Sequence, residues 1–147
     1  MHLTLLFMEN VDPACIPELL QVGADVARRA AGFDLVLDRA TVWRRGGIAH
    51  LAPQHPPVAL LELRGALAQG VARRGLPFDA RAFSPHFTLG RRAEGLDPPT
   101  GFEPLRWRVR GFALVQSMLG SGRYVVLGHW PARGRATAAR GEPCRSR

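Results

Sequence analysis

The pattern His-x-Thr-Leu occurs twice in this chain, each time within a run of residues typical of a β-strand. The first copy is His2–Leu5 and the second is His86–Leu89. Because the chain has only five histidines, chance would produce two copies in roughly one chain in a thousand or fewer. Side chains at positions i and i+2 of a strand project from the same face. Each copy is therefore expected to direct one imidazole and one hydroxyl to one side, while its apolar residues face the core.

Hydrophobic periodicity predicts the elements around the two copies. Apolar residues recur at helical spacing over 13–31 and 57–74, and a glycine follows each run, as is typical of helix ends. Strands are expected at 2–8, 33–38, 40–45, 48–52 and 82–91, followed by a hairpin of 105–117 with 123–130. Since the helices alternate with runs of antiparallel strands, this order favours an α+β fold over a doubly wound parallel sheet.

Length and charge predict one folded domain and a tail. The chain has 147 residues, 46% of them hydrophobic, and a net charge of +8, which is enough apolar material for one core. Residues 132–147 carry half of that charge on five arginines and have the composition of a disordered segment. We therefore expect a domain over 1–131 and a disordered basic tail over 132–147. A basic balance is compatible with a phosphate-bearing substrate.

Several features indicate a cytoplasmic protein that does not associate with membranes. No apolar run approaches the ~20 residues that a membrane helix needs, and the chain does not begin with the features of a signal peptide. Cys15 and Cys144 are too few for a metal cluster and are expected to be reduced thiols.

The paired motifs suit phosphodiester hydrolysis without a metal. A neutral imidazole can take a proton from an attacking water, and a protonated one can donate a proton to the departing oxygen. An ordinary histidine pKa of about 6.5 lets both forms exist at cellular pH. The hydroxyls of Thr4 and Thr88 can donate hydrogen bonds to phosphoryl oxygens.

The histidines could also have a structural or a metal-binding role. A single His-x-Thr in a strand is usually part of a solvated face, and the pairing of the two motifs argues against that role here. A zinc site would need a third ligand. His50, His55 and His129 are expected in loops or at strand ends, so none is a convincing one.

The chain resembles the RNA 2',3'-cyclic phosphodiesterases, also called the 2'-5' RNA ligase family, within the two-histidine phosphoesterase superfamily. The resemblance covers most of residues 2–131 and rests on HLTLLFM, SPHFTLGR and FALVQSMLGSGRYVVLGHW. It implies two pseudo-symmetric lobes with the active site in the cleft between them. It also implies hydrolysis of RNA 2',3'-cyclic phosphate ends to 2'-phosphomonoesters without metal or nucleotide cofactor. Some relatives also join RNA ends through a 2'-5' bond.

The resemblance assigns roles to the motif residues. His2 would donate a proton to the leaving oxygen, His86 would activate water, and Thr4 and Thr88 would hold the phosphate. The same resemblance makes Arg91 a candidate phosphate ligand.

Strand geometry limits what Arg91 can do. Strict alternation places it on the face opposite His86, so it reaches the phosphate only if the strand ends or bulges at Gly90. Tyr124 and Trp130 are able to stack on a base but are expected in the core or at the rim.

Family members normally begin with a strand and a helix ahead of the first motif, and this chain starts at the motif itself. An open sheet edge is therefore expected beside residues 2–8. The alternative function is a non-catalytic RNA-binding module that keeps the cleft. The expected partner is RNA or a nucleotide with a 2',3'-cyclic phosphate, bound by a monomer.

Overall fold

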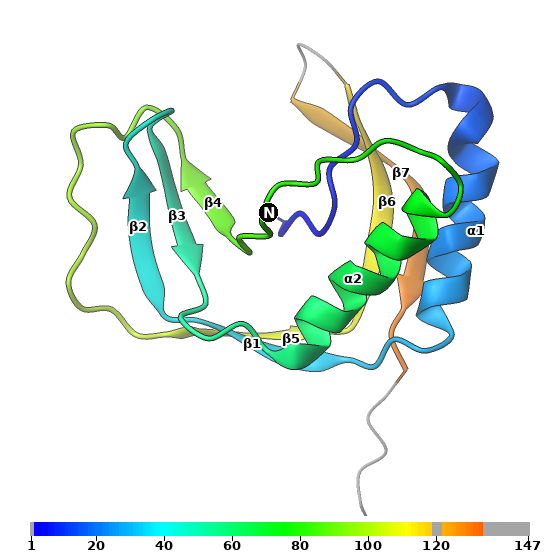
Figure 1. The fold of residues 1–147 in the computed structure, drawn as a ribbon. Helices are drawn as coiled ribbons and strands as arrows, with labels where there is room; N and C mark the ends of the chain where they lie inside the picture. Colours follow the sequence, from blue (N-terminus) through cyan, green and yellow to red (C-terminus); the bar gives the residue numbers. More distant parts are fainter. Residues whose placement is uncertain (1, 119–121, 134–147) are drawn as a thin grey trace, which may run out of the picture.

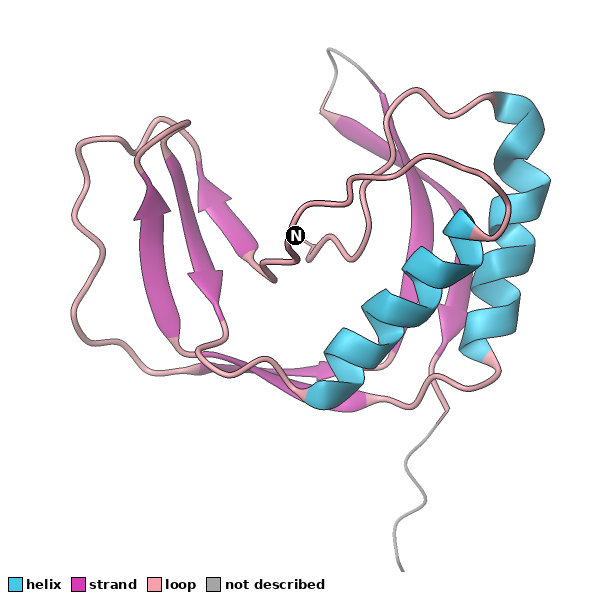
Figure 2. Cartoon of the chain, viewed as in Figure 1, coloured by secondary structure: helices cyan, strands magenta, loops and turns pink. Residues whose placement is uncertain are grey.

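The strands form three small antiparallel sheets, and both helices lie on one side of the molecule (Figures 1 and 2). The structure is a computed structural model and describes residues 2–118 and 122–133. The helical elements are η1 (Pro13–Cys15), α1 (Ile16–Ala27) and α2 (Val58–Ala72). The strands are β1 (Phe33–Leu37), β2 (Arg39–Trp43), β3 (Ile48–Ala52), β4 (Phe87–Gly90), β5 (Leu105–Val109), β6 (Gly111–Met118) and β7 (Arg123–Pro131). The predicted α+β class is confirmed.

The three sheets divide the molecule into two parts joined by a β-ribbon. One sheet has the order β2-β3-β4, a second pairs β6 with β7, and a third pairs β1 with β5. Figure 1 shows β2-β3-β4 on one side, the helices with β6 and β7 on the other, and the β1–β5 pair running between them. Both helices therefore gather on the side of β6 and β7. None of the helices in the described part of the chain is long and apolar enough to cross a membrane.

The long strand predicted at 105–117 is in fact two strands with different partners. Residues 105–109 pair with β1, with Leu35 opposite Trp107. Residues 111–118 form the predicted hairpin with β7, although three of the four residues of its expected turn, 119–121, lie outside the described part. The chain changes partner at Arg110, whose carbonyl oxygen accepts a hydrogen bond from the Ala132 amide at 2.7 Å.

Residues 2–8 do not form the predicted strand. They make one isolated antiparallel bridge, between Leu3 and Phe87, and the Phe7 carbonyl accepts a hydrogen bond from the Asp79 amide at 2.8 Å. A strand needs a continuous ladder to a neighbour, and no other residue of this segment forms a bridge in the described structure. The predicted alternation still holds at its start, where His2 and Thr4 are exposed and Leu3 is partly buried.

The chain stays bonded to the domain for two residues past its expected end at 131. The Arg133 amide donates to the Ala30 carbonyl at 2.9 Å, and the Arg133 carbonyl accepts from the Gly32 amide at 3.0 Å. Residues 132 and 133 are thus bonded to the domain, and the rest of the expected tail lies outside the described residues.

The main core lies between α2 and the β1–β5 ribbon. The inward side chains of β1 are Phe33, Leu35 and Leu37, of which Leu37 is fully buried. They pack with Leu60 and Leu63 of α2, and Phe87 and Phe112 complete the cluster. A second, smaller cluster forms where α1 meets α2, around Leu19, Val22 and Val71.

Helix α1 approaches β7 closely at a glycine. A Cβ atom at Gly23 would overlap the indole of Trp130, and that indole itself packs against Phe112 in a tilted arrangement with ring centroids 5.4 Å apart. We expect Gly23→Ala to lower the free energy of unfolding by about 1–3 kcal/mol, because a close-packed interior resists an added methyl group. Urea unfolding followed by circular dichroism measures this change.

Gly65 in α2 is the matched control. A Cβ atom there would have no neighbour within 4 Å. Gly65→Ala should therefore raise the free energy of unfolding by up to about 1 kcal/mol through helix propensity alone. Equal and favourable effects at both glycines would contradict the close packing of α1 on Trp130.

Candidate active site

The two His-x-Thr-Leu motifs meet side by side, although they are far apart in the sequence. Leu3 and Phe87, the second residue of each motif, form an antiparallel bridge. Phe87 belongs to the main core, and Leu3 packs against it. The second residue of each motif thus faces the core, so the flanking first and third residues point to the opposite face.

The bridge also determines which polar side chains are neighbours. On either side of an antiparallel pair, the next residue of one strand lies opposite the preceding residue of the other. His2 therefore lies opposite Thr88, and Thr4 lies opposite His86, in a local two-fold arrangement. His2 and Thr4 are exposed, and His86 and Thr88 are partly buried. The structure brings together the four residues that the sequence selected.

The fourth residues of the two motifs do not behave alike. Leu5 packs against the main core as expected. Leu89 is 53% exposed, so the expectation that it faces the core is wrong. The main core ends at Phe87, and β4 extends past it toward Gly90, where the core no longer covers that face of the strand.

Strand β4 is shorter than predicted, and His86 lies just before its first residue. Pro85 precedes His86 and has no amide hydrogen to extend a ladder. The Ser84 carbonyl lies 2.9 Å from Nδ1 of His86. A carbonyl oxygen only accepts, so Nδ1 carries the hydrogen and Nε2 of the neutral ring is left as the proton acceptor. The loop before β4 thereby gives His86 the tautomer that a general base needs.

His86 forms a cluster of three rings with Trp43 and His50. The Trp43 ring lies 4.5 Å from the His86 ring and 4.2 Å from the His50 ring, and the two imidazoles are 5.6 Å apart, all between centroids. His50 is 2% exposed. The cluster restrains the ring of His86 from the side of β2 and β3.

Sequence reasoning missed this cluster. His50 is at the centre of β3, not in a loop or at a strand end as expected, and it pairs with Thr41 on one side and Thr88 on the other. The sequence offered one signal for His50, because it is the one polar residue in the predicted strand 48–52. The contact of Trp43 with His86 depends on strand register and side-chain direction, which the sequence does not reveal.

Burial lowers the pKa of His50 below its ordinary value of 6.5. The charges of His86 and Arg39 also disfavour its protonated form, whereas its bond to the Ile48 carbonyl at 3.1 Å opposes the shift. The folded protein thus binds a proton at His50 less readily than the unfolded chain does. The associated stability is present above pH 6.5 and is lost as the pH falls below that value.

We therefore expect wild-type stability to fall as the pH drops below 6.5, with a contribution from His50 of up to about 1.4 kcal/mol per pH unit. The variant His50→Phe keeps a ring and removes the titrating group, so its stability should fall less steeply. His55→Gln, at an exposed position, is the control and should follow the wild type. Urea unfolding at several pH values measures the slopes, and parallel slopes for His50→Phe and wild type would contradict this account.

Tyr124 of β7 contacts the other motif histidine. Its ring lies 4.9 Å from the His2 ring in an edge-on arrangement, and it is 52% exposed. Tyr124 thus lies next to His2 as Trp43 lies next to His86. Of the two positions expected for Tyr124, in the core or at the rim, the structure shows the exposed one. Trp130 instead packs in the core against Phe112.

Strand β4 ends at Gly90, so Arg91 lies beyond the strand in an exposed bend. Because the strand has ended, the side chain of Arg91 need not lie on the face opposite His86. Its contact with a phosphate stays a prediction.

The described cysteine and histidines do not gather into a larger cluster. Cys15 is free and partly exposed, and Cys144 lies outside the described residues. Within the described ranges, no group of three or more His, Cys, Asp or Glu side chains is arranged to hold a metal ion.

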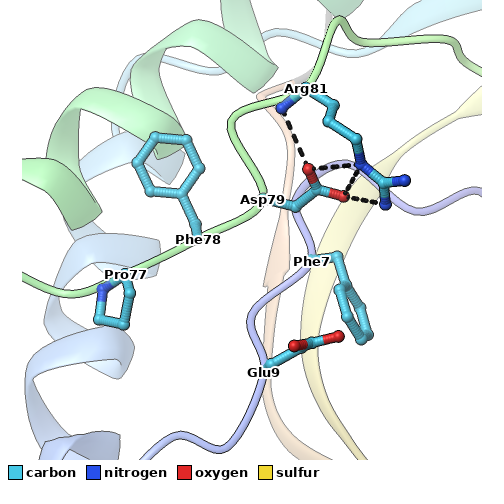
Figure 3. A pocket seen from close by; sticks show the side chains of 6 residues that line it. All are labelled: Phe7, Glu9, Pro77, Phe78, Asp79 and Arg81. Carbon is cyan, nitrogen blue, oxygen red and sulfur yellow. Dashed lines mark hydrogen bonds and ion pairs between the residues drawn. The ribbon is translucent and has the colours of Figure 1, made fainter.

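A cavity of about 330 Å³ lies beside the residues that follow the first motif, not at the motif histidines. It is lined by Phe7, Glu9, Pro77, Phe78, Asp79 and Arg81 (Figure 3). Hydrogen bonds from Arg81 hold the pKa of Asp79 at about 2, below its ordinary 3.8. The Asp79 amide donates a hydrogen bond to the Phe7 carbonyl. The turn that contains Asp79 therefore anchors the segment that carries His2 and Thr4.

Comparison with known proteins identifies clear relatives. Residues 1–120 match the sequence family described as the 2'-5' RNA ligase superfamily. The RNA 2',3'-cyclic phosphodiesterase of Escherichia coli K12 is 35% identical over 134 residues, which cover 88% of this chain and 74% of that protein. The protein of the same name from Thermus thermophilus is 33% identical over 151 residues, covering 91% and 73%.

Solved structures agree with the sequence matches. The crystal structure of E. coli LigT complexed with 3'-AMP superposes with a TM-score of 0.74 at 34% identity, covering 89% of this chain and 76% of that one. The structure of TT0787 of Thermus thermophilus superposes with a TM-score of 0.72 at 31% identity, covering 90% and 78%. These chains share the arrangement of strands and helices described above.

Proposed function

The chain belongs to the 2'-5' RNA ligase superfamily, and on that premise we propose that it is an RNA 2',3'-cyclic phosphodiesterase. It opens the cyclic phosphate at an RNA end and leaves a 2'-phosphomonoester. The observation that carries the proposal is the antiparallel contact of the two motifs at Leu3 and Phe87. That contact puts two imidazoles and two hydroxyls on one face, which is the set of groups that such a reaction needs.

His86 acts as the general base. Its Nδ1 hydrogen is engaged by the Ser84 carbonyl at 2.9 Å, so Nε2 accepts a proton from the attacking water. The water oxygen forms a bond to phosphorus while the bond from phosphorus to the 3' oxygen breaks. A correctly placed general base raises the rate of such a reaction by about 10²–10⁴-fold.

His2 acts as the general acid. Its protonated ring gives a proton to the departing 3' oxygen, which becomes the ribose hydroxyl, and the phosphate stays on the 2' oxygen. Thr4 and Thr88 donate hydrogen bonds to the non-bridging oxygens, where negative charge grows in the transition state. Arg91 follows β4 directly, so the end of the strand frees its side chain to reach a phosphate of the bound substrate.

The two imidazoles supply both proton transfers, so the proposed reaction needs neither a metal nor a nucleotide cofactor. The proposed substrate is RNA or a nucleotide that ends in a 2',3'-cyclic phosphate, bound by a monomer in the cytoplasm. The same site can join ends through a 2'-5' bond if a ribose hydroxyl replaces water as the attacking group.

The direct test is incubation of the purified chain with cytidine 2',3'-cyclic phosphate in EDTA, beside His86→Ala. We expect cytidine 2'-phosphate from the wild type only, identified by phosphorus NMR. A 3'-phosphate product would contradict the assigned leaving oxygen. Binding of the substrate without any product would instead support the RNA-binding alternative.

A further inference from the structure

Four arginines occupy one edge of the sheet that carries the second motif. Arg44 and Arg45 follow β2, and Arg91 and Arg92 follow β4. Strands β2 and β4 both pair antiparallel with β3, so they run in the same direction and end at the same edge (Figure 1). We call these four residues the arginine rim.

A backbone contact holds the two halves of the rim together. The Ala93 amide donates to the Gly47 carbonyl at 2.9 Å, which links the turn after β2 to the turn after β4. Gly47 has a positive φ of 57°, and a Cβ atom there would overlap the carboxylate of Glu94. The two turns that carry the rim are thus held next to each other by a hydrogen bond and by close packing.

The guanidinium groups of the rim have no anionic partner among the described residues. All four residues are exposed, and none forms an ion pair with any residue that the structure describes, Glu94 included. Arg28, Arg74, Arg81 and Arg108 each pair with a carboxylate. Several other exposed arginines also form no ion pair within the described part of the chain, and the rim differs from them because its four arginines follow two strands that end at the same edge of one sheet. Guanidinium groups bind phosphate through paired hydrogen bonds, so a free set of them favours a phosphate-rich ligand.

The rim begins beside the active site and leads away from it. Trp43, whose ring contacts His86, immediately precedes Arg44. Arg91 follows His86 by five positions, on the other side of β4, and an extended chain of that length spans about 16 Å. A few nucleotides of a single strand span such a distance. Because a cyclic phosphate is at the 3' end of an RNA, the rest of the chain must leave the site in the 5' direction.

We propose that the arginine rim binds the backbone phosphates of nucleotides on the 5' side of the cyclic phosphate. The proposal rests on the proposed function and adds to it a preference for oligonucleotides over mononucleotides. Contacts to phosphates carry little sequence information, so the preference concerns length and not base sequence.

The test compares two substrates, cytidine 2',3'-cyclic phosphate and a six-nucleotide RNA with a 2',3'-cyclic end. The triple variant Arg44→Gln, Arg45→Gln, Arg92→Gln should raise KM for the hexanucleotide at least tenfold. It should also lower the slope of log KM against log salt by about 2, since each phosphate contact on a single strand contributes about 0.7. KM and kcat for the mononucleotide should stay as in the wild type.

The control variant removes the same charge elsewhere. Arg29→Gln, Arg73→Gln, Arg110→Gln changes three exposed arginines that also lack ion pairs among the described residues. It should match the wild type on both substrates. If the rim variant matches the wild type on the hexanucleotide while both open the mononucleotide, the rim proposal is overturned and the proposed function stands.

A binding measurement separates the two proposals if turnover is absent. Anisotropy of the hexanucleotide with a 5' fluorophore reports affinity without any reaction. If no protein makes product but the wild type and the control bind the hexanucleotide more tightly than the rim variant does, the rim proposal stands and the proposed hydrolysis is rejected. Equal binding by all three proteins would reject the rim.

Discussion

Replacing His86 by alanine is expected to lower kcat for cyclic-phosphate opening by about 10²–10⁴-fold, because the attacking water loses its proton acceptor. The ring is partly buried beside Trp43 and His50, so the variant has room for a small base. Added imidazole should therefore restore part of the activity of His86→Ala. Initial rates with the mononucleotide, with and without imidazole, measure both effects.

His2→Ala should cause a loss of similar size for a different reason, since the leaving 3' oxygen loses its proton donor. A substrate analogue with a leaving group that needs no protonation, such as a nitrophenyl phosphodiester, should recover rate in His2→Ala but not in His86→Ala. His55→Ala, at an exposed position, is the control and should be fully active. Full activity of either motif variant would refute the assigned chemistry.

Replacing Thr88 by valine is expected to lower kcat by about 10²-fold with little change in KM, because its hydrogen bond strengthens as charge develops on the phosphoryl oxygens. Valine keeps the β-branch that suits a strand, so β4 should keep its pairing with β3. Thr4→Val should behave alike, since the Leu3–Phe87 bridge relates the two threonines by a local two-fold arrangement. Thr88→Ser should retain most of the activity.

Thr41 offers a control within the same sheet. It pairs with His50, which in turn pairs with Thr88, so Thr41 occupies the same row two strands away. Thr41→Val should leave kcat and KM unchanged, while circular dichroism and thermal unfolding show that all variants are folded. Equal losses of activity in Thr41→Val and Thr88→Val would mean that these threonines stabilise the sheet and do not bind the phosphate.

The sequence predicted local features of the fold better than its long-range pairing. Helices α1 and α2 and the β6–β7 hairpin lie close to the predicted ranges, because periodicity reports burial on one face of an element. The strand at 105–117 was predicted as one element because its pattern runs on through Arg110. Only the distant partner, β1, shows that residues 105–109 belong to another sheet.

The candidate site was predicted as far as a repeated motif allows. The four motif residues come together as expected because alternation fixes their faces and the bridge fixes their neighbours. Trp43 and His50 were not predicted, since their contact with His86 depends on three strands in register. A lone aromatic and a lone histidine carry no motif that would single them out.

The Leu3–Phe87 bridge has a consequence for how the protein fails on heating. It is the one backbone bridge that residues 2–8 form in the described structure, and the Phe7–Asp79 hydrogen bond is the other backbone tie to this segment. A segment with so few backbone bonds opens at lower free energy than a packed core does. Its amide hydrogens should exchange with deuterium well before those of β1. Catalysis would then disappear at temperatures where the helices are still intact, so a thermal scan of activity and one of ellipticity should give different midpoints.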